Sequence, residues 1–234
     1  MKRLLPLFSI AVFISPAYAQ NNFEAIDRYF VEETESGRLS GAVLTITGPD
    51  ATLYQKAFGL RVPDCDEAMS KGALFRLYSM TKPITTVAVL QLMEEGKFRL
   101  SDPISTYLPE FKVQEDTPSI WDLLRHTSGL TYGQGGKEVT TAYRENDLLL
   151  STWVKGDPQK SLTNEDVSQR LAASPLAFKH GEKWAYVRST DVLGRLVEVI
   201  SGQSLEDYLQ DRVLRPLGMA DTTFHPSNRD KLAE

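Results

Sequence analysis

The segment from Pro83 to Met93 constrains the fold more than any other part of this sequence, because it is apolar on nearly every side of a helix. It reads PITTVAVLQLM, carries no charged residue, and is followed by Gly96, a residue that ends helices. A helix that is apolar all round is stable only when other elements cover it, so we expect it in the centre of a domain. The chain has 234 residues, of which 41% are hydrophobic, and this suffices for one domain with a substantial core.

A β-hairpin is predicted before this helix, and only helices are predicted after it. The β-branched run Gly41–Thr47 and the alternating run Ala51–Gly59 are joined by a Gly-Pro-Asp turn. Helical periodicity predicts further helices over residues 23–37, 119–129, 164–173, 189–202 and 204–218. The polar stretch 131–162 is predicted to be a surface loop. Because a lone hairpin is marginally stable, this α+β order predicts a sheet that needs further strands.

The first nineteen residues have the pattern of a secretory signal peptide. Lys2 and Arg3 precede the apolar run 4–14, and Ala17-Tyr18-Ala19 forms a small-residue cleavage site. A membrane anchor is the alternative, but an apolar run this short cannot span a bilayer. We therefore expect 1–19 to be removed, no transmembrane segment in the mature chain, and a periplasmic or secreted protein whose single domain spans 20–234.

Charge and cysteine content exclude several classes of function. Without Lys2 and Arg3 the mature chain has 24 basic and 31 acidic residues, a net charge of −7, with no basic stripe, so nucleic acid is not an expected partner. Cys65 is the single cysteine, and no internal disulfide can form. The three histidines lack metal-ligand spacing, and no metal or other cofactor is expected.

Ser79 and Lys82 both fall at the start of the predicted apolar helix. A serine is common at this position, whereas a lysine is unfavourable. Serine is a common N-cap, which is the structural explanation for Ser79. Lys82 falls in the first turn, where the helix dipole disfavours a cation, beside an apolar helix that would exclude water. Both effects predict a lowered pKa and a neutral amine that can accept a proton. Residues three apart lie on one helix face, so the pair has the chemistry of an activated Ser-Lys nucleophile.

Four segments together give a specific resemblance to a known family. The chain resembles the serine β-lactamase and penicillin-binding-protein superfamily, in the class C-like branch that includes family VIII carboxylesterases and DD-peptidases. The matching segments, in family order, are FRLYSMTKPITTVAVLQLMEEGKFRLSDPISTYLPEF, IWDLLRHTSGL, PLAFKHGEKWAYVRSTDVLGRLVEVISGQSLEDYL and RVLRPLGMADTTF. The resemblance implies a β-lactamase/transpeptidase-like fold, with an antiparallel sheet flanked by helices and a helical subdomain.

The resemblance also assigns roles to individual residues. By matching position, Ser79 is the acylated nucleophile, Lys82 its proton acceptor, and Tyr186 the tyrosine that passes a proton to the leaving group. His126, within HTSGL, has a structural role in the family. Arg188 replaces the asparagine, serine or small residue usual in the second motif. In the substrate cleft it would favour carboxylate-bearing substrates, and alternatively its side chain turns outward.

The family's third motif does not occur in this sequence. No K-[ST]-G, H-[ST]-G or W-G-G is present, although the family uses that strand to complete the sheet and the oxyanion hole. The resemblance therefore implies a chain that lacks the C-terminal strands. The corresponding hypothesis is that these 234 residues fold poorly and hydrolyse slowly.

Two functions follow as predictions. The first is a serine hydrolase that forms an acyl-enzyme on Ser79 and cleaves a small-molecule β-lactam, short-chain ester or D-amino-acid peptide. The alternative is an inactive or non-turnover relative that recognises penicillin or binds peptidoglycan. Acylation without turnover would distinguish the second from the first. The absence of G-x-S-x-G argues against an α/β-hydrolase.

Overall fold

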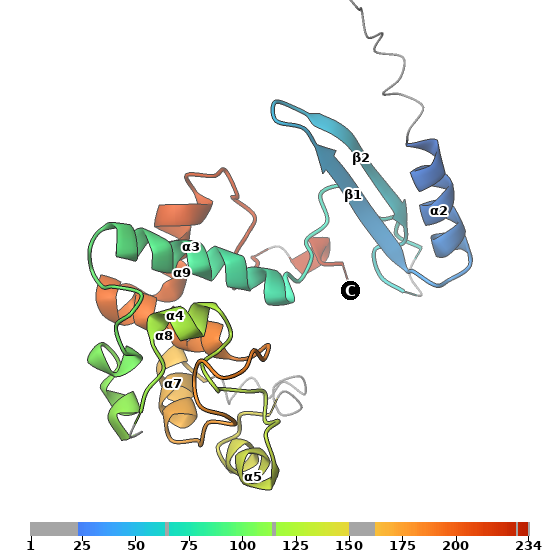
Figure 1. The fold of residues 1–234 in the computed structure, drawn as a ribbon. Coiled ribbons are helices and arrows are strands. Elements are labelled where there is room, and N and C mark those ends of the chain that lie inside the picture. The colour runs from blue at the N-terminus through green and yellow to red at the C-terminus, as the bar shows by residue number, and fades with distance from the viewer. Residues whose placement is uncertain (1–22, 64–65, 114–115, 150–161, 228, 234) are drawn as a thin grey trace, which may run out of the picture. The chain divides into compact units, whose positions relative to one another are not determined.

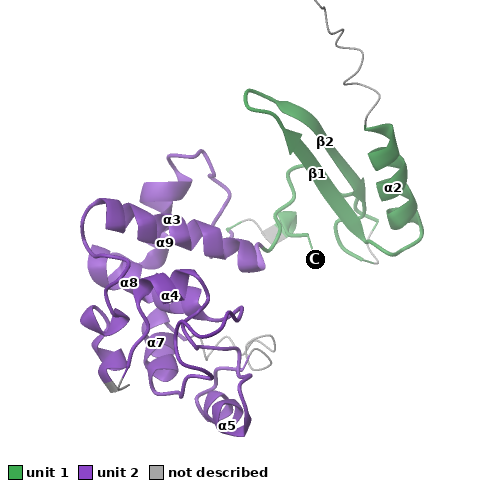
Figure 2. Cartoon of the chain, in the orientation of Figure 1, with its two compact units in different colours: residues 1–76, 227–234 green, residues 77–226 purple. Residues whose placement is uncertain are grey.

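The computed structural model describes residues 23–63, 66–113, 116–149, 162–227 and 229–233. The predicted signal peptide and Cys65 lie outside these ranges. The chain divides into two compact units, one formed by residues 1–76 and 227–234 and the other by residues 77–226 (Figure 2). The first holds an antiparallel sheet and the second is helical. The prediction of a single hydrolase domain over residues 20–234 stays a prediction.

The predicted hairpin is present in the first unit. Strand β1, Gly41–Thr47, pairs antiparallel with β2, Thr52–Gly59, and the register places Ala42 opposite Phe58 and Ile46 opposite Tyr54 (Figure 1). Within the described residues these strands form one two-stranded sheet. The predicted strand bounds are confirmed to within one residue.

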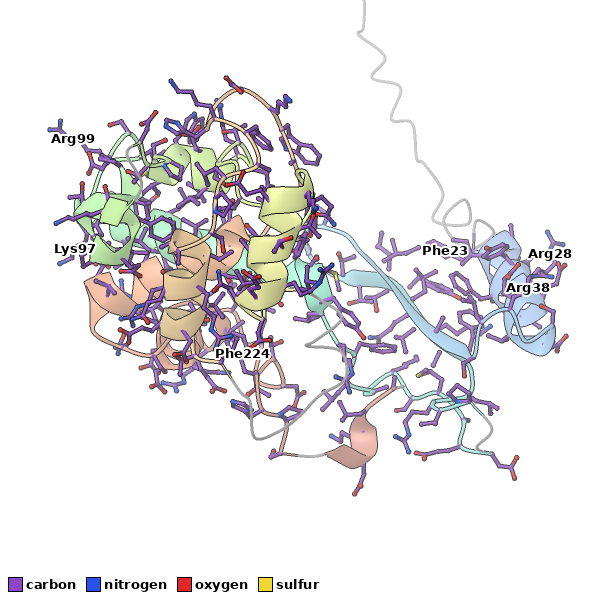
Figure 3. All side chains as sticks on the ribbon, turned by 90° about the horizontal axis from the view of Figure 1, so that it is seen from below. Phe23, Arg28, Arg38, Lys97, Arg99 and Phe224 are labelled. Carbon is purple, nitrogen blue, oxygen red and sulfur yellow. The ribbon has the colours of Figure 1, made fainter. Side chains whose placement is uncertain are left out.

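Helix α2, Glu24–Glu35, packs on this hairpin through aromatic rings and one carboxylate. Phe23, at the start of α2 (Figure 3), contacts the Tyr54 ring with centroids 4.8 Å apart, and Phe30 stacks on Phe58 at 5.2 Å. Asp27 accepts a hydrogen bond from the Tyr54 hydroxyl and lies 2.9 Å from Lys56 Nζ. These contacts explain why the 23–37 pattern forms a helix on the sheet.

The last described residues pair with the segment that leaves the hairpin. The 3₁₀ turn η6, Arg229–Lys231, precedes a parallel bridge between Leu74 and Leu232. Leu74 donates its N–H to the Lys231 carbonyl at 2.7 Å, and Ala233 donates to the Leu74 carbonyl at 2.9 Å. The sequence pattern had not predicted this pairing.

The second unit is built from helices around α8, Ser189–Ser201 (Figure 1). Helix α8 contacts four neighbouring helices. The other described helices and turns of this unit are η1 (Tyr78–Met80), α3 (Thr81–Glu94), η2 (Ile104–Thr106), η3 (Pro109–Val113), α4 (Ile120–Leu124), α5 (Lys137–Glu145), α7 (Asn164–Ala172), α9 (Leu205–Leu209) and the π-helical turn η5 (Gln210–Leu214).

The core of this unit lies between α8 and the helices packed against it. Four apolar side chains of α8 are at most 1% exposed, namely those of Val192, Leu193, Leu196 and Val197. Helix α3 adds Ala88, Val89 and Leu92 to this core, whereas its Val87 is 43% exposed. Within the second unit, the other helices cover one face of α3 and leave Val87 exposed. The prediction that this unit buries α3 on every side is therefore wrong.

Helix starts were predicted better than helix ends. Ser119 and Asp122 form the predicted capping box at α4, and Thr163 and Asp166 form a second one at α7. Helix α4 nevertheless ends at Leu124 rather than near Gly129, because His126 adopts a left-handed φ of 60° that no α-helix continues.

The predicted loop 131–162 contains a helix. Lys137–Glu145 forms α5, which buries Val139 and Tyr143. This part of the prediction was wrong because a two-residue apolar stripe is too short to stand out in a polar segment. Residues 150–161 lie outside the described ranges. Among the described residues, no helix has the length and apolar character needed to cross a bilayer.

Candidate active site

Ser79 lies in the 3₁₀ turn η1, immediately before α3. The N-cap of α3 is Met80, and no side chain caps this helix. The structural explanation of Ser79 as an N-cap is therefore wrong, and its hydroxyl is available for other contacts. The preceding residue, Tyr78, has φ 45°, a left-handed conformation that costs a non-glycine residue free energy. Such strain clusters at functional sites, where surrounding structure maintains it.

Lys82 brings its ammonium group to Ser79 and to two tyrosines. Its Nζ donates a hydrogen bond to Ser79 Oγ at 3.2 Å and another to the Tyr132 hydroxyl at 3.4 Å. The same Nζ lies 4.7 Å from the centre of the Tyr186 ring. The structure thus brings together the three residues that the sequence predicted as catalytic, and it adds Tyr132.

The predicted decrease in the pKa of Lys82 is wrong in sign. Burial does lower this pKa, but the hydrogen bond with Tyr186 and the interactions with Tyr132 outweigh it, and the pKa of Lys82 is raised overall. The sequence-based prediction considered only the apolar helix and its dipole, because the two tyrosines that raise the pKa belong to distant segments.

Tyr186 shows the complementary change. The pKa of its phenol is lowered by the hydrogen bond with Ser79 and then by the hydrogen bond with Lys82. Burial opposes these two effects, and the charge of Lys82 adds a smaller decrease in this pKa. The side chain is 44% exposed, so water and solutes reach it. A tyrosine with a lowered pKa beside a protonated lysine is suited to accept a proton from Ser79.

His126 lies beside this group, next to Tyr186. Its ring packs against those of Tyr186, with centroids 5.1 Å apart, and Trp184, at 6.1 Å. Burial and the charge of Lys82 lower the pKa of His126. Its carbonyl accepts a hydrogen bond from Ala185 N at 3.0 Å and so fixes the backbone next to Tyr186. This geometry fits the structural role expected for His126.

Arg188 does not line an open surface. Its side chain is 2% exposed, its Nη2 donates to the Leu148 carbonyl at 2.7 Å, and its Nη1 lies 3.5 Å from Asp191 Oδ2. The guanidinium also lies 5.4 Å from the centre of the Tyr132 ring. The expectations that Arg188 meets a substrate carboxylate or turns outward are both inconsistent with this burial, because hydrogen bonds hold the guanidinium in the interior.

Tyr132 is the residue that sequence reasoning missed. It is fifty positions from Lys82 and outside the S-x-x-K and tyrosine motifs, so only the fold brings it to the site. Its N–H donates to Gln134 Oε1 at 3.2 Å, and the Thr131 N–H donates to the buried Tyr143 hydroxyl at 3.0 Å. The position between Gly129 and Gly133 was the available signal, since these glycines have φ of 84° and 94° and shape the turn.

Metal ligation is a separate question from this serine-centred chemistry. Within the described ranges, no group of three or more His, Cys, Asp or Glu side chains is arranged to hold a metal ion.

Comparison with known families and curated proteins gives consistent matches. A sequence model described as Beta-lactamase matches residues 26–233. Esterase EstB of Burkholderia gladioli is 34% identical over 215 residues, which are 89% of this chain and 53% of that protein. Lovastatin esterase of Penicillium rubens is 28% identical over 227 residues, covering 88% of this chain and 54% of that protein. The chain thus spans about half the length of the curated relatives it matches.

A solved structure shares the fold. The protein described as EstCE1, a hydrolase with promiscuous acyltransferase activity, superposes with a TM-score of 0.81 at 27% identity, over 93% of this chain and 57% of that one. This likeness confirms the fold class that the sequence predicted.

Proposed function

Because the chain belongs to the β-lactamase family, we propose that it is a serine hydrolase that forms an acyl-enzyme on Ser79. The observation that carries the proposal is the 3.2 Å contact between Lys82 Nζ and Ser79 Oγ, with the Tyr186 phenol beside both groups. A serine within hydrogen-bond reach of a cation and a proton acceptor is the arrangement of an activated nucleophile.

In the proposed first step, Ser79 Oγ attacks a substrate carbonyl while Tyr186, as phenolate, takes the hydroxyl proton. The C–O bond forms as the carbonyl electron pair moves onto its oxygen. The Lys82 ammonium stabilises the phenolate before transfer. This interaction contributes both to the raised pKa of Lys82 and to the lowered pKa of Tyr186. This assigns the proton-accepting role to Tyr186 rather than to Lys82, the residue predicted from the sequence.

In the proposed later steps, the Tyr186 hydroxyl returns the proton to the leaving alkoxide or amine as the tetrahedral intermediate collapses. Water then attacks the acyl carbonyl, with the regenerated phenolate accepting its proton. The second tetrahedral intermediate collapses by breaking the bond to Ser79 Oγ, which takes the proton back from Tyr186 as the acid product leaves. Ser79 precedes the first turn of α3, whose partial positive charge favours the negative charge that develops on the reacting oxygen.

We propose esters as the first substrate class to examine. Esterase EstB and lovastatin esterase are named for ester hydrolysis, and the description of EstCE1 adds acyl transfer. The alcohol part of an ester leaves as an alkoxide, which one proton from Tyr186 neutralises. β-Lactams and D-amino-acid peptides are amide substrates of the same proposed chemistry.

Labelling with a fluorophosphonate probe tests the proposal. The purified chain is expected to gain the mass of one probe less hydrogen fluoride, because Ser79 Oγ displaces fluoride from phosphorus. Peptide mapping should place the adduct on Ser79, and Ser79→Ala should remain unlabelled. The control is Ser201→Ala, at a half-buried serine that ends α8, and it should label like the parent. A folded parent chain without an adduct would refute the proposal.

The rate of this labelling should depend on pH in a bell shape. Tyr186 must lose its proton, so the rate rises with pH through a pKa that is lower than the ordinary phenol value of about 10. Lys82 must keep its proton, so the rate falls again through a pKa above the ordinary lysine value. Tyr186→Phe should slow labelling and abolish the acidic limb. An acidic limb that survives in Tyr186→Phe would contradict the assigned role.

A further inference from the structure

Arg188 is a buried cation for which the proposed reaction has no direct use. Its side chain is 2% exposed although it lies two residues from the exposed Tyr186. Moving a guanidinium out of water is costly unless hydrogen bonds and partners compensate it. The Leu148 carbonyl and Asp191 supply such partners. These two partners hold the guanidinium group in place beside an aromatic ring.

That ring belongs to Tyr132, whose hydroxyl accepts a hydrogen bond from Lys82. The Arg188 guanidinium lies 5.4 Å from the centre of the Tyr132 ring, within the range of a cation–π contact. Tyr186 borders the same ring, with centroids 6.2 Å apart. Two residues of one segment thus contact the Tyr132 ring, and its hydroxyl lies 3.4 Å from Lys82 Nζ.

We propose that Arg188 is a positioning residue, which holds the Tyr132 ring so that its hydroxyl stays within reach of Lys82. The inference rests on the proposed function, because it concerns the same Ser79 site. Its guanidinium contacts Leu148, Asp191 and the Tyr132 ring, and in this proposal it acts on Lys82 through Tyr132. The residue that departs from the family pattern thus helps to set the hydrogen bonding of Lys82.

In this proposal, the position of the Tyr132 hydroxyl controls the pKa of Lys82. The charged and titratable groups that face Lys82 are Tyr132, Tyr186, His126 and Asp191, together with the Ser79 hydroxyl. Tyr132 is one of the two groups that raise the pKa of Lys82. If the Tyr132 hydroxyl moves away, that pKa is expected to fall and the cation beside Tyr186 becomes less persistent.

Two substitutions separate this role from a purely structural one. Arg188→Met retains a long side chain without charge or planar face, and Tyr132→Phe retains the ring without the hydroxyl. Both are expected to slow Ser79 labelling about tenfold, equivalent to about 1.4 kcal/mol. The double variant should be no slower than Tyr132→Phe alone, because both changes remove the same contact. Arg188→Lys should resemble Arg188→Met, since an ammonium lacks the planar face.

A matched control, Arg195, lies about two helical turns further along α8. Arg195 also contacts carboxylates, at 3.0 Å to Glu165 and 3.5 Å to Glu198, and has no contact with the Lys82 group in the described structure. Arg195→Met should alter stability without changing the labelling rate of the folded chain. Rates are normalised to the folded fraction from circular dichroism, so loss of fold does not count as loss of positioning.

The deciding measurement is the titration of Lys82 by lysine side-chain NMR, which needs no reactive Ser79. Arg188→Met and Tyr132→Phe are expected to lower the pKa of Lys82 to the same value, and Arg195→Met to leave it unchanged. An unchanged Lys82 titration in folded Arg188→Met would overturn the inference, as would additive rate losses in the double variant. If the parent chain does not label but the titration shifts as expected, the proposed function fails and the positioning role stands.

Discussion

Replacing Lys82 by methionine is expected to slow the labelling of Ser79 about a thousandfold, the range associated with loss of proton-transfer catalysis. Methionine has a similar length and no charge, so Tyr186 loses the ammonium that lowers the pKa of its phenol. Ser79 also loses its 3.2 Å contact. The measurement is the second-order labelling rate of the folded variant. Lys97→Met, a change at an exposed lysine after α3, should stay within about threefold of the parent.

Lys82→Arg then decides which form of the lysine is active. An arginine keeps the positive charge but cannot act as a base, since its pKa exceeds about 12. If Lys82 works as a cation that supports the Tyr186 phenolate, the arginine variant should label much faster than the methionine variant. If Lys82 is instead the neutral proton acceptor that the sequence predicted, both variants should be equally slow. A methionine variant that labels like the parent would rule out both roles.

Replacing Leu196 by alanine is expected to lower the free energy of unfolding of the helical unit by about 3 kcal/mol. Leu196 is fully buried on α8, where four neighbouring helices leave little freedom to collapse into the space. The loss is large against the 5–15 kcal/mol, roughly, that holds a typical domain folded. Urea unfolding followed by tryptophan fluorescence measures it, because all three tryptophans lie within residues 77–226.

Val199→Ala is the matched control on the same helix. Its side chain is 42% exposed, so its truncation should change the free energy of unfolding by less than about 0.5 kcal/mol. Equal losses for the two variants would mean that α8 does not form the centre of the core. A loss for Leu196→Ala below about 1 kcal/mol would have the same meaning.

Local chemistry made much of the fold predictable from the sequence. The hairpin was placed within one residue, because β-branched runs and a Gly-Pro-Asp turn depend on neighbours alone. The capping box at Ser119 was likewise readable over four positions. The end of α4 was not, because the left-handed His126 is set by packing against Trp184 and Tyr186.

Three members of the candidate site were predictable, whereas Tyr132 and the electrostatics of the site were not. S-x-x-K spacing and family resemblance pointed to Ser79, Lys82 and Tyr186, which the structure brings together. The direction of the Lys82 pKa depends on Tyr132, fifty residues away, and the burial of Arg188 depends on the Leu148 carbonyl, forty residues away. Contacts of that sequence separation leave no periodic or local signal, so they become visible only in three dimensions.

The bridge between Leu74 and Leu232 has a consequence for the order of folding during synthesis. Residues 77–226 form one unbroken stretch, so the helical unit can fold as soon as that stretch leaves the ribosome. The sheet-containing unit takes residues from both sides of that stretch, and its Leu74 N–H finds the Lys231 carbonyl only after the intervening chain has been made. The segment around Leu74 therefore pairs late, and closing so long a loop makes completion of this unit the slower event.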